Sequence, residues 1–166
     1  MATTLIHNGL IHDAVHCEAY VADILLADGK IVAIGGELTA PADAAVFDAD
    51  GLEVYPGFVE AHTHIGLDGY GIGYEGCDYN EMNDIWTPQL CAIDGINPRD
   101  EAFGNAIGGG VTTAVTGPGS ANVLGGTFVA MKLYGDCVDD MILKYPAAMK
   151  IAFGENPKGV YGQNGH

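Results

Sequence analysis

The residue pattern of this chain changes at Pro56-Gly57, and the change limits the folds that it can adopt. Before this point, short apolar runs alternate with turn signals. Ala27-Asp28-Gly29-Lys30 is typical of a hairpin, because both central residues of a type I′ turn take positive φ. Residues 1–55 are therefore predicted to form a small antiparallel β unit. After this point, strand-like and helix-like runs alternate, which predicts parallel β/α units over residues 56–166 and an α/β protein with a β appendage.

The apolar runs, and the turn and capping residues that bound them, predict the helices and strands of both parts. One helix is expected from Pro98 to Ile107 with Asn97 as its N-cap, and a second, short helix from Asp139 to Lys144 that Tyr145-Pro146 closes. The long segment 66–97, rich in glycine and aromatic residues, is expected to be a functional loop. Strands are expected at residues 5–11, 21–27, 31–34, 44–48, 52–55, 58–61, 111–116, 128–133 and 148–153.

Charge excludes several classes of partner. Six Lys and Arg against 22 Asp and Glu give a net charge of −16, a field that repels nucleic-acid phosphates and anionic membrane surfaces. No apolar run approaches the roughly 20 residues of a membrane span, and the first residues lack the pattern of a secretion signal. The four cysteines form no C-x-x-C pair and are expected to be free thiols. We therefore expect a cytoplasmic protein that binds neither nucleic acid nor membranes.

The pair His62-x-His64 is the sharpest chemical feature. It directly follows the apolar run Phe58–Ala61, which is predicted to be a strand. Side chains two residues apart on a strand point to the same face, so both imidazoles can reach one metal ion. Imidazole suits zinc, iron, manganese or nickel. A bare pair could equally be two solvent-facing histidines, so the surrounding residues decide between the two interpretations.

The surrounding residues resemble the amidohydrolase superfamily, particularly its imidazolonepropionase and dihydroorotase types. Pro56–His64 is similar to the signature at the first barrel strand of that superfamily, in which Pro-Gly precedes a short strand ending in His-x-His. Four further phrases of the family are matched, and the resemblance covers most of residues 5–117. These phrases are Leu5–Ile11, Ile24–Gly35, Asp48–Gly57 and Gly110–Ala114.

The resemblance implies a partial (β/α)8 barrel preceded by part of a small antiparallel β-sandwich. It also implies a divalent metal site at the barrel mouth that holds one or two ions, with zinc as the expected metal. His62 and His64 match the first two metal ligands. A further ligand in this family is a Glu or a carbamylated Lys from a later strand. Glu155 is the first choice because it follows the expected strand 148–153, and Lys150 within that strand is the second. The alternatives are that Glu155 caps a turn and that Lys150 is an ordinary strand residue.

Length limits how much of such a barrel this span can form. A complete (β/α)8 barrel takes about 250 residues, and residues 56–166 are fewer than half of that number. At most three or four of the eight strands are expected here. The resemblance then implies an N-terminal fragment, inactive alone, whose proton-shuttle Asp lies beyond the chain.

Two functions follow as alternatives. The first is the N-terminal part of a metal-dependent hydrolase that uses metal-activated water to cleave an amide or cyclic amide C–N bond, other than a peptide bond, in a small-molecule substrate. The second is a non-catalytic, metal-binding half-barrel that needs a partner chain, whether a second copy or the remainder of the same protein. In the long loop, Asn80, Glu81 and Asp84 would suit a cationic or polar substrate, although such residues are more often solvated surface.

Overall fold

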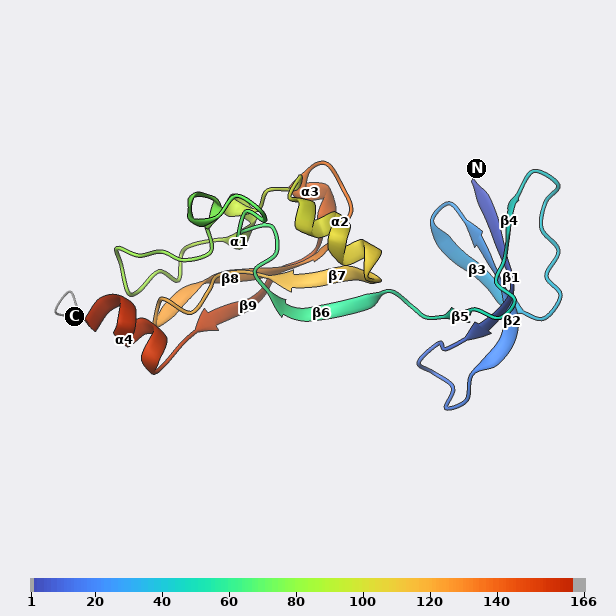
Figure 1. The fold of residues 1–166 in the computed structure, drawn as a ribbon, viewed down its shortest axis with the longest axis horizontal. Coiled ribbons are helices and arrows are strands. Elements are labelled where there is room, and N and C mark those ends of the chain that lie inside the picture. Colours follow the sequence, from blue (N-terminus) through green and yellow to red (C-terminus); the bar gives the residue numbers. More distant parts are fainter. Residues whose placement is uncertain (1, 163–166) are drawn as a thin grey trace. The chain divides into compact units, whose positions relative to one another are not determined.

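The computed structural model describes residues 2–162, and Figure 1 shows their fold. The chain divides into two compact units, Met1–Pro56 and Gly57–His166. Each unit is described by itself.

The first unit is a five-stranded sheet with the order β3-β2-β1-β4, in which β5 also pairs with β1. Its small core centres on Ile11, Ala22 and Ile24. The strands are β1 (Thr3–Ile11), β2 (Tyr20–Ala27), β3 (Lys30–Gly35), β4 (Ala45–Asp48) and β5 (Glu53–Val54).

Strand directions in this unit match the prediction in part. β1 pairs with β2 and β2 with β3 in antiparallel fashion, and Asp28 (φ 51°) and Gly29 (φ 73°) make the β2–β3 turn with positive φ at both positions, as predicted. The expectation of a wholly antiparallel unit is wrong, because β4 and β5 run parallel to β1. Residues 36–44 are long enough to carry the chain back before β4 begins, as a parallel pairing requires.

The second unit is a four-stranded sheet with the order β6-β7-β8-β9 and short helices. Its strands are β6 (Phe58–Thr63), β7 (Val111–Thr116), β8 (Leu124–Lys132) and β9 (Ile142–Ile151). Its helices are η1 (Tyr74–Gly76), α1 (Ala92–Gly95), α2 (Glu101–Gly108), α3 (Val138–Met141) and α4 (Glu155–Tyr161).

Parallel β/α units were expected throughout this unit, but only β6 and β7 are parallel. β7 pairs with β8, and β8 with β9, in antiparallel fashion. The connection 117–123 contains no helix, so the chain reverses there instead of crossing over. Within residues 2–162 the sheet is open, and the antiparallel pairing of β7, β8 and β9 differs from the parallel strands of the partial barrel that the resemblance implies.

Both expected helices are shorter than predicted. Asp100, not Asn97, is the N-cap of α2, and its side chain accepts a hydrogen bond from the Ala102 amide. The Asn97 side chain instead accepts from the Arg99 amide in the preceding turn. The helix expected at residues 139–144 ends at Met141, where the long edge strand β9 takes over. An edge strand tolerates the proline at position 146, which was expected to end a helix.

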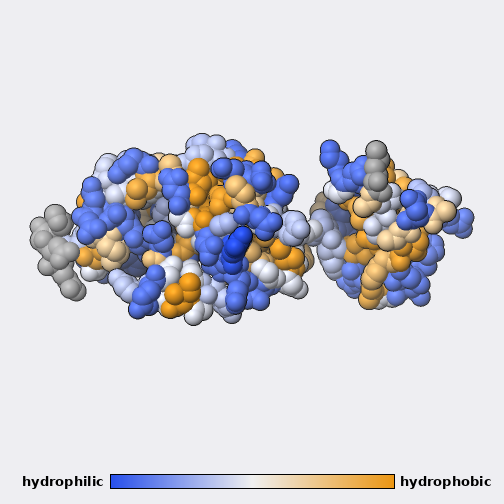
Figure 2. All heavy atoms as spheres, turned by 90° about the horizontal axis from the view of Figure 1, so that it is seen from above, coloured by the Kyte–Doolittle hydropathy of each residue, from blue (hydrophilic) through white to orange (hydrophobic). Residues whose placement is uncertain are grey.

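The core of this unit lies between the sheet and α1, α2 and α3, which lie together over one face of the sheet (Figure 1). Ala92, Phe103 and Met141 from these helices pack with Val129 and Met131 of β8. Elsewhere, large apolar residues stay exposed, and Figure 2 shows apolar patches between the polar ones. On the edge strands β6 and β9 these are Phe58, Val59, Leu143, Met149 and Ile151. None of the helices in the described part of the chain is long and apolar enough to cross a membrane.

Candidate metal centre

His62 and His64 lie together at the end of β6. His62 is the penultimate residue of the strand and His64 is the first residue beyond it. Their ring centroids are 5.6 Å apart and the rings are nearly perpendicular, with an interplanar angle of 87°. The period of two along a strand therefore brings the two imidazoles together, as the sequence predicted.

The ring of His64 is oriented by contacts from two distant segments. Its Nδ1 lies 2.7 Å from the carbonyl oxygen of Gly117, the residue directly after β7. Because a carbonyl only accepts, Nδ1 carries the proton and donates it, which leaves the lone pair on Nε2. The ring also stacks on Tyr79, with centroids 5.2 Å apart. Donation from one nitrogen to a backbone carbonyl is the arrangement that orients metal-binding histidines through the other nitrogen.

His62 lies between an aromatic ring and a lysine. Phe128 of β8 contacts it edge-on, with ring centroids 5.5 Å apart. On β9, the Nζ of Lys150 lies 3.5 Å from the His62 Nε2, a contact between residues 88 positions apart in the chain. The fold thus brings the second-choice candidate, Lys150, to the histidine pair.

Lys150 is buried, with 9% of its surface exposed. Burial lowers the pKa of its amine, because desolvation penalises the charged form. No carboxylate among residues 2–162 forms an ion pair with it. Gly125 faces its stem, since a side chain at Gly125 would come within 3.1 Å of the Lys150 Cβ. Desolvation therefore disfavours the charged form of this amine relative to an exposed lysine.

Glu155 has a different environment. It is the first residue of α4, its side chain is 93% exposed, and its carboxylate pairs with Lys158 at 3.6 Å. The expected strand 148–153 ends at Ile151, and the chain then turns through Gly154, where φ is 100°. Glu155 therefore faces solvent in this span, where its side chain contacts Lys158.

The donor set fits a divalent metal in part. His64, and His62 as a neutral imidazole, supply nitrogen lone pairs of the kind that zinc and similar metals bind. No group of three His, Cys, Asp or Glu side chains within residues 2–162 could hold a metal ion. A third donor from this part of the chain would therefore have to come from Lys150.

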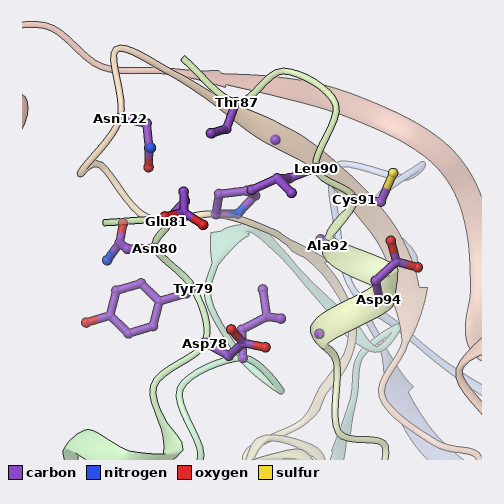
Figure 3. Close-up of a pocket in the computed structure, with 14 residues that line it drawn as sticks. Asp78, Tyr79, Asn80, Glu81, Thr87, Leu90, Cys91, Ala92, Asp94 and Asn122 are labelled. Carbon is purple, nitrogen blue, oxygen red and sulfur yellow. The ribbon is translucent and has the colours of Figure 1, made fainter. Parts of the chain in front are cut away.

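A cavity of about 250 Å³, shown in Figure 3, lies in the second unit, and neither His62 nor His64 is among its described lining residues. Tyr79, which stacks on His64, and Pro118, which follows Gly117, both line it. The long loop contributes most of the wall, as expected for a functional loop. Asn80 and Glu81 line the cavity, whereas the Asp84 side chain accepts a hydrogen bond from the Trp86 amide.

Sequence reasoning missed the residues that orient the histidines, namely Gly117, Tyr79 and Phe128. Gly117 is the residue directly after β7. A side chain there would come within 2.4 Å of the Phe128 ring, so the glycine is required by a close approach. The one available signal was a glycine directly after the β-branched run 111–116.

Comparisons with known proteins identify relatives of this chain. No protein-family model matches the chain. A crystal structure of an amidohydrolase from Thermotoga maritima MSB8 superposes with a TM-score of 0.92 and 41% sequence identity, covering 98% of this chain and 42% of that one. The amidohydrolase tasK of Hapsidospora irregularis is 32% identical over 160 residues, which are 86% of this chain and 16% of tasK. An allantoinase of Escherichia coli O1:K1 / APEC is 48% identical over 73 residues, 43% of this chain and 15% of the allantoinase.

The chain thus spans less than half the length of each of these proteins. The match to the Thermotoga structure extends over both units and includes the histidine pair within its 98% coverage. On these matches, the chain belongs to the amidohydrolase superfamily.

Proposed function

We propose that this chain supplies metal ligands to a hydrolase that cleaves the C–N bond of a cyclic amide in a small molecule. The observation that carries the proposal is the convergence of His62, His64 and Lys150 from β6 and β9. The similarity to an allantoinase and to two amidohydrolases supports a hydrolase of this kind. The parallel pairing of β6 with β7 supports the interpretation of these two strands as the first strands of a barrel.

His62 and His64 would hold the metal, which we take to be zinc. When bound, such an ion polarises the substrate carbonyl and makes hydroxide available near neutral pH. The Gly117 carbonyl accepts the proton of His64 Nδ1, so that in the neutral ring the lone pair for the metal lies on Nε2. Phe128 keeps water from one side of the His62 ring.

Lys150 would serve as the third ligand after reaction with carbon dioxide. The neutral amine attacks the carbon of CO₂, an N–C bond forms, one proton leaves the nitrogen, and the product is a carbamate anion. A buried amine with a lowered pKa favours this reaction, because only the uncharged form has a lone pair to donate. Glu155 is the competing candidate, and it would have to leave its exposed pairing with Lys158 to contribute.

Zinc binding to the 166-residue chain tests the ligands. Isothermal titration with zinc in bicarbonate buffer is expected to give one site that His62→Ala or His64→Ala abolishes. Lys150→Met should weaken it by at least tenfold, and Glu155→Gln should leave it unchanged. His16→Ala removes an exposed histidine of the first unit and is the matched control. Equal zinc affinity in all five variants would refute the proposed centre.

Hydrolysis must be tested on the whole protein that contains this chain. Ring opening of allantoin, and of other five- and six-membered cyclic amides, is followed with and without a chelator. Loss of activity on chelation and recovery with zinc are expected. Activity that survives both chelation and His62→Ala would overturn the proposal.

The alternative is a metal-binding half-barrel without catalysis, completed by a partner chain. The exposed apolar residues of the edge strands β6 and β9 favour it. It predicts a zinc-binding chain that associates with a second copy or another chain and never accelerates hydrolysis. Light scattering of the 166-residue chain, together with the hydrolysis assay on the whole protein, separates the two functions.

A further inference from the structure

We propose that the cavity lined by Tyr79 binds a cationic N–H group, of the guanidinium or ammonium class, carried by the small-molecule substrate. That the bound molecule is a substrate rests on the proposed function. The binding chemistry itself rests on the cavity wall, which combines a buried unpaired carbonyl oxygen with three carboxylates.

The first observation is the side chain of Asn122, which is 1% exposed and lines the cavity. Its Nδ2 donates to the Asp84 carbonyl at 2.6 Å and to the Tyr161 hydroxyl at 3.0 Å. The Tyr161 hydroxyl gives its own hydrogen to a backbone carbonyl, 2.8 Å away at Glu81 or 2.9 Å away at Asp84, so it accepts from Asn122. Both amide hydrogens are thus engaged, which fixes the orientation of the amide.

The oxygen of this amide is left without a donor from residues 2–162. Figure 3 shows the oxygen end of Asn122 directed toward Asn80 and Glu81 across the cavity. A buried side chain that presents only an acceptor selects a ligand with N–H or O–H donors.

The second observation is the charge of the wall. Asp78, Glu81 and Asp94 all line the cavity, and none of them forms an ion pair within the described part of the chain. One Glu81 oxygen accepts from the Asn83 amide at 2.6 Å, which leaves the other oxygen for a ligand. The described lining contains no Lys or Arg. With a net charge of −16 on the chain, the cavity favours a cation over a neutral or anionic donor.

Size and position suit one end of a small substrate. About 250 Å³ is the liquid volume of about eight water molecules, enough for a guanidinium or ammonium group with a short stem. Tyr79 lines the cavity and its ring stacks on His64, so one aromatic side chain links the cavity wall to the histidine pair. The cavity would thus select the substrate end that is not cleaved.

The test is a titration of the 166-residue chain with methylguanidinium chloride at constant ionic strength with a chelator present. Binding is followed by calorimetry and by the side-chain amide signals of Asn122. Saturable binding with a shift of these signals is expected, and N-methylurea, a neutral molecule of similar shape, should not bind. Methylammonium in place of methylguanidinium shows whether a planar fork or a point charge is preferred. If neither cation binds, or if N-methylurea binds equally well, the proposal is overturned.

Charge variants give the second readout. Asp78→Asn and Glu81→Gln should each weaken methylguanidinium binding by about two- to fivefold, the range of partly exposed charge pairs. Asp139→Asn, in the first turn of α3 and outside the cavity, makes the same change in net charge and should have no effect. Equal weakening by Asp139→Asn would reduce the effect to net charge and refute the site. Zinc titration of the same variants is independent, so failure of the metal centre and failure of the cation site are distinguishable.

Discussion

Replacing Gly117 with alanine tests whether the close approach of β7 to Phe128 shapes the histidine pair. A Cβ at this position would lie 2.4 Å from Cγ and 2.6 Å from both Cδ atoms of the Phe128 ring, where ordinary contacts are 3.4–4 Å. The ring must therefore retreat by about 1 Å, which is overpacking of a buried side chain. Phe128 is 5% exposed and its ring contacts His62, so the displacement reaches the candidate metal centre.

The expected cost to unfolding is about 1–3 kcal/mol, the usual range for extra atoms in a packed core. For a chain of this size that lowers the midpoint of thermal unfolding by about 2–12 °C. The Gly117 carbonyl that accepts from His64 shifts with the backbone. Zinc affinity should then fall by about tenfold, as it does when a partner that orients a metal ligand is lost.

Urea unfolding and zinc calorimetry measure the two effects, with Gly104→Ala as the control. A Cβ at Gly104, inside α2, meets nothing within 4 Å, so this change should stabilise the protein by about 0.4–1 kcal/mol. In the double variant Gly117→Ala/Phe128→Ala the clash is gone. The loss of unfolding free energy in the double variant should therefore be smaller than the sum of the losses in the two single variants by about 1 kcal/mol or more. The steric argument is refuted if Gly117→Ala unfolds like the unmodified chain, or if the two costs simply add.

Three further predictions concern stability. Phe103→Ala should destabilise the second unit by about 3–5 kcal/mol in urea, because Phe103 is 4% exposed and joins α2 to the core; a smaller loss than for an exposed aromatic such as Tyr134 would contradict this. Gly29→Val should destabilise the first unit by about 1–2 kcal/mol, since φ is 73° there, and thermal unfolding by circular dichroism would show it. The hydrogen bond from the Asn8 amide, with further bonds from Leu38 and His7, holds the pKa of Asp23 below its usual range. Its stabilisation is therefore complete above the ordinary carboxyl pKa and is lost as the pH falls through the lowered one, so Asp23→Asn should flatten the acid limb of a stability profile between pH 2 and 6.

Local features were predictable from the sequence. The β2–β3 turn follows from Asp28-Gly29 alone, because few residue pairs take positive φ at both positions. The apolar runs gave most strands within a few residues, except that β9 begins at Ile142, where a helix was expected. The period of two along β6 placed His62 next to His64. The family signature around this pair could also be recognised, because it is one continuous stretch, Pro56–His64.

Strand directions were not predictable in the same way. The same apolar run can pair in either direction. The direction of pairing depends on the length and structure of the connection, as between β7 and β8, and on the packing that this connection permits. The early start expected for α2 was wrong because Asn97 satisfies a turn, and the true cap, Asp100, makes the equivalent bond three residues later.

By itself, then, the sequence determined the local conformations and the two imidazoles, because those depend on residues that are neighbours in the chain. Only the tertiary structure decided that Lys150, and not Glu155, meets His62, and that the Gly117 carbonyl orients His64. The contact between His62 and Lys150 joins residues 88 positions apart across the sheet. Its formation depends on strand order and register. These are set by burial of the whole core, so they cannot be inferred from the residue type at either position.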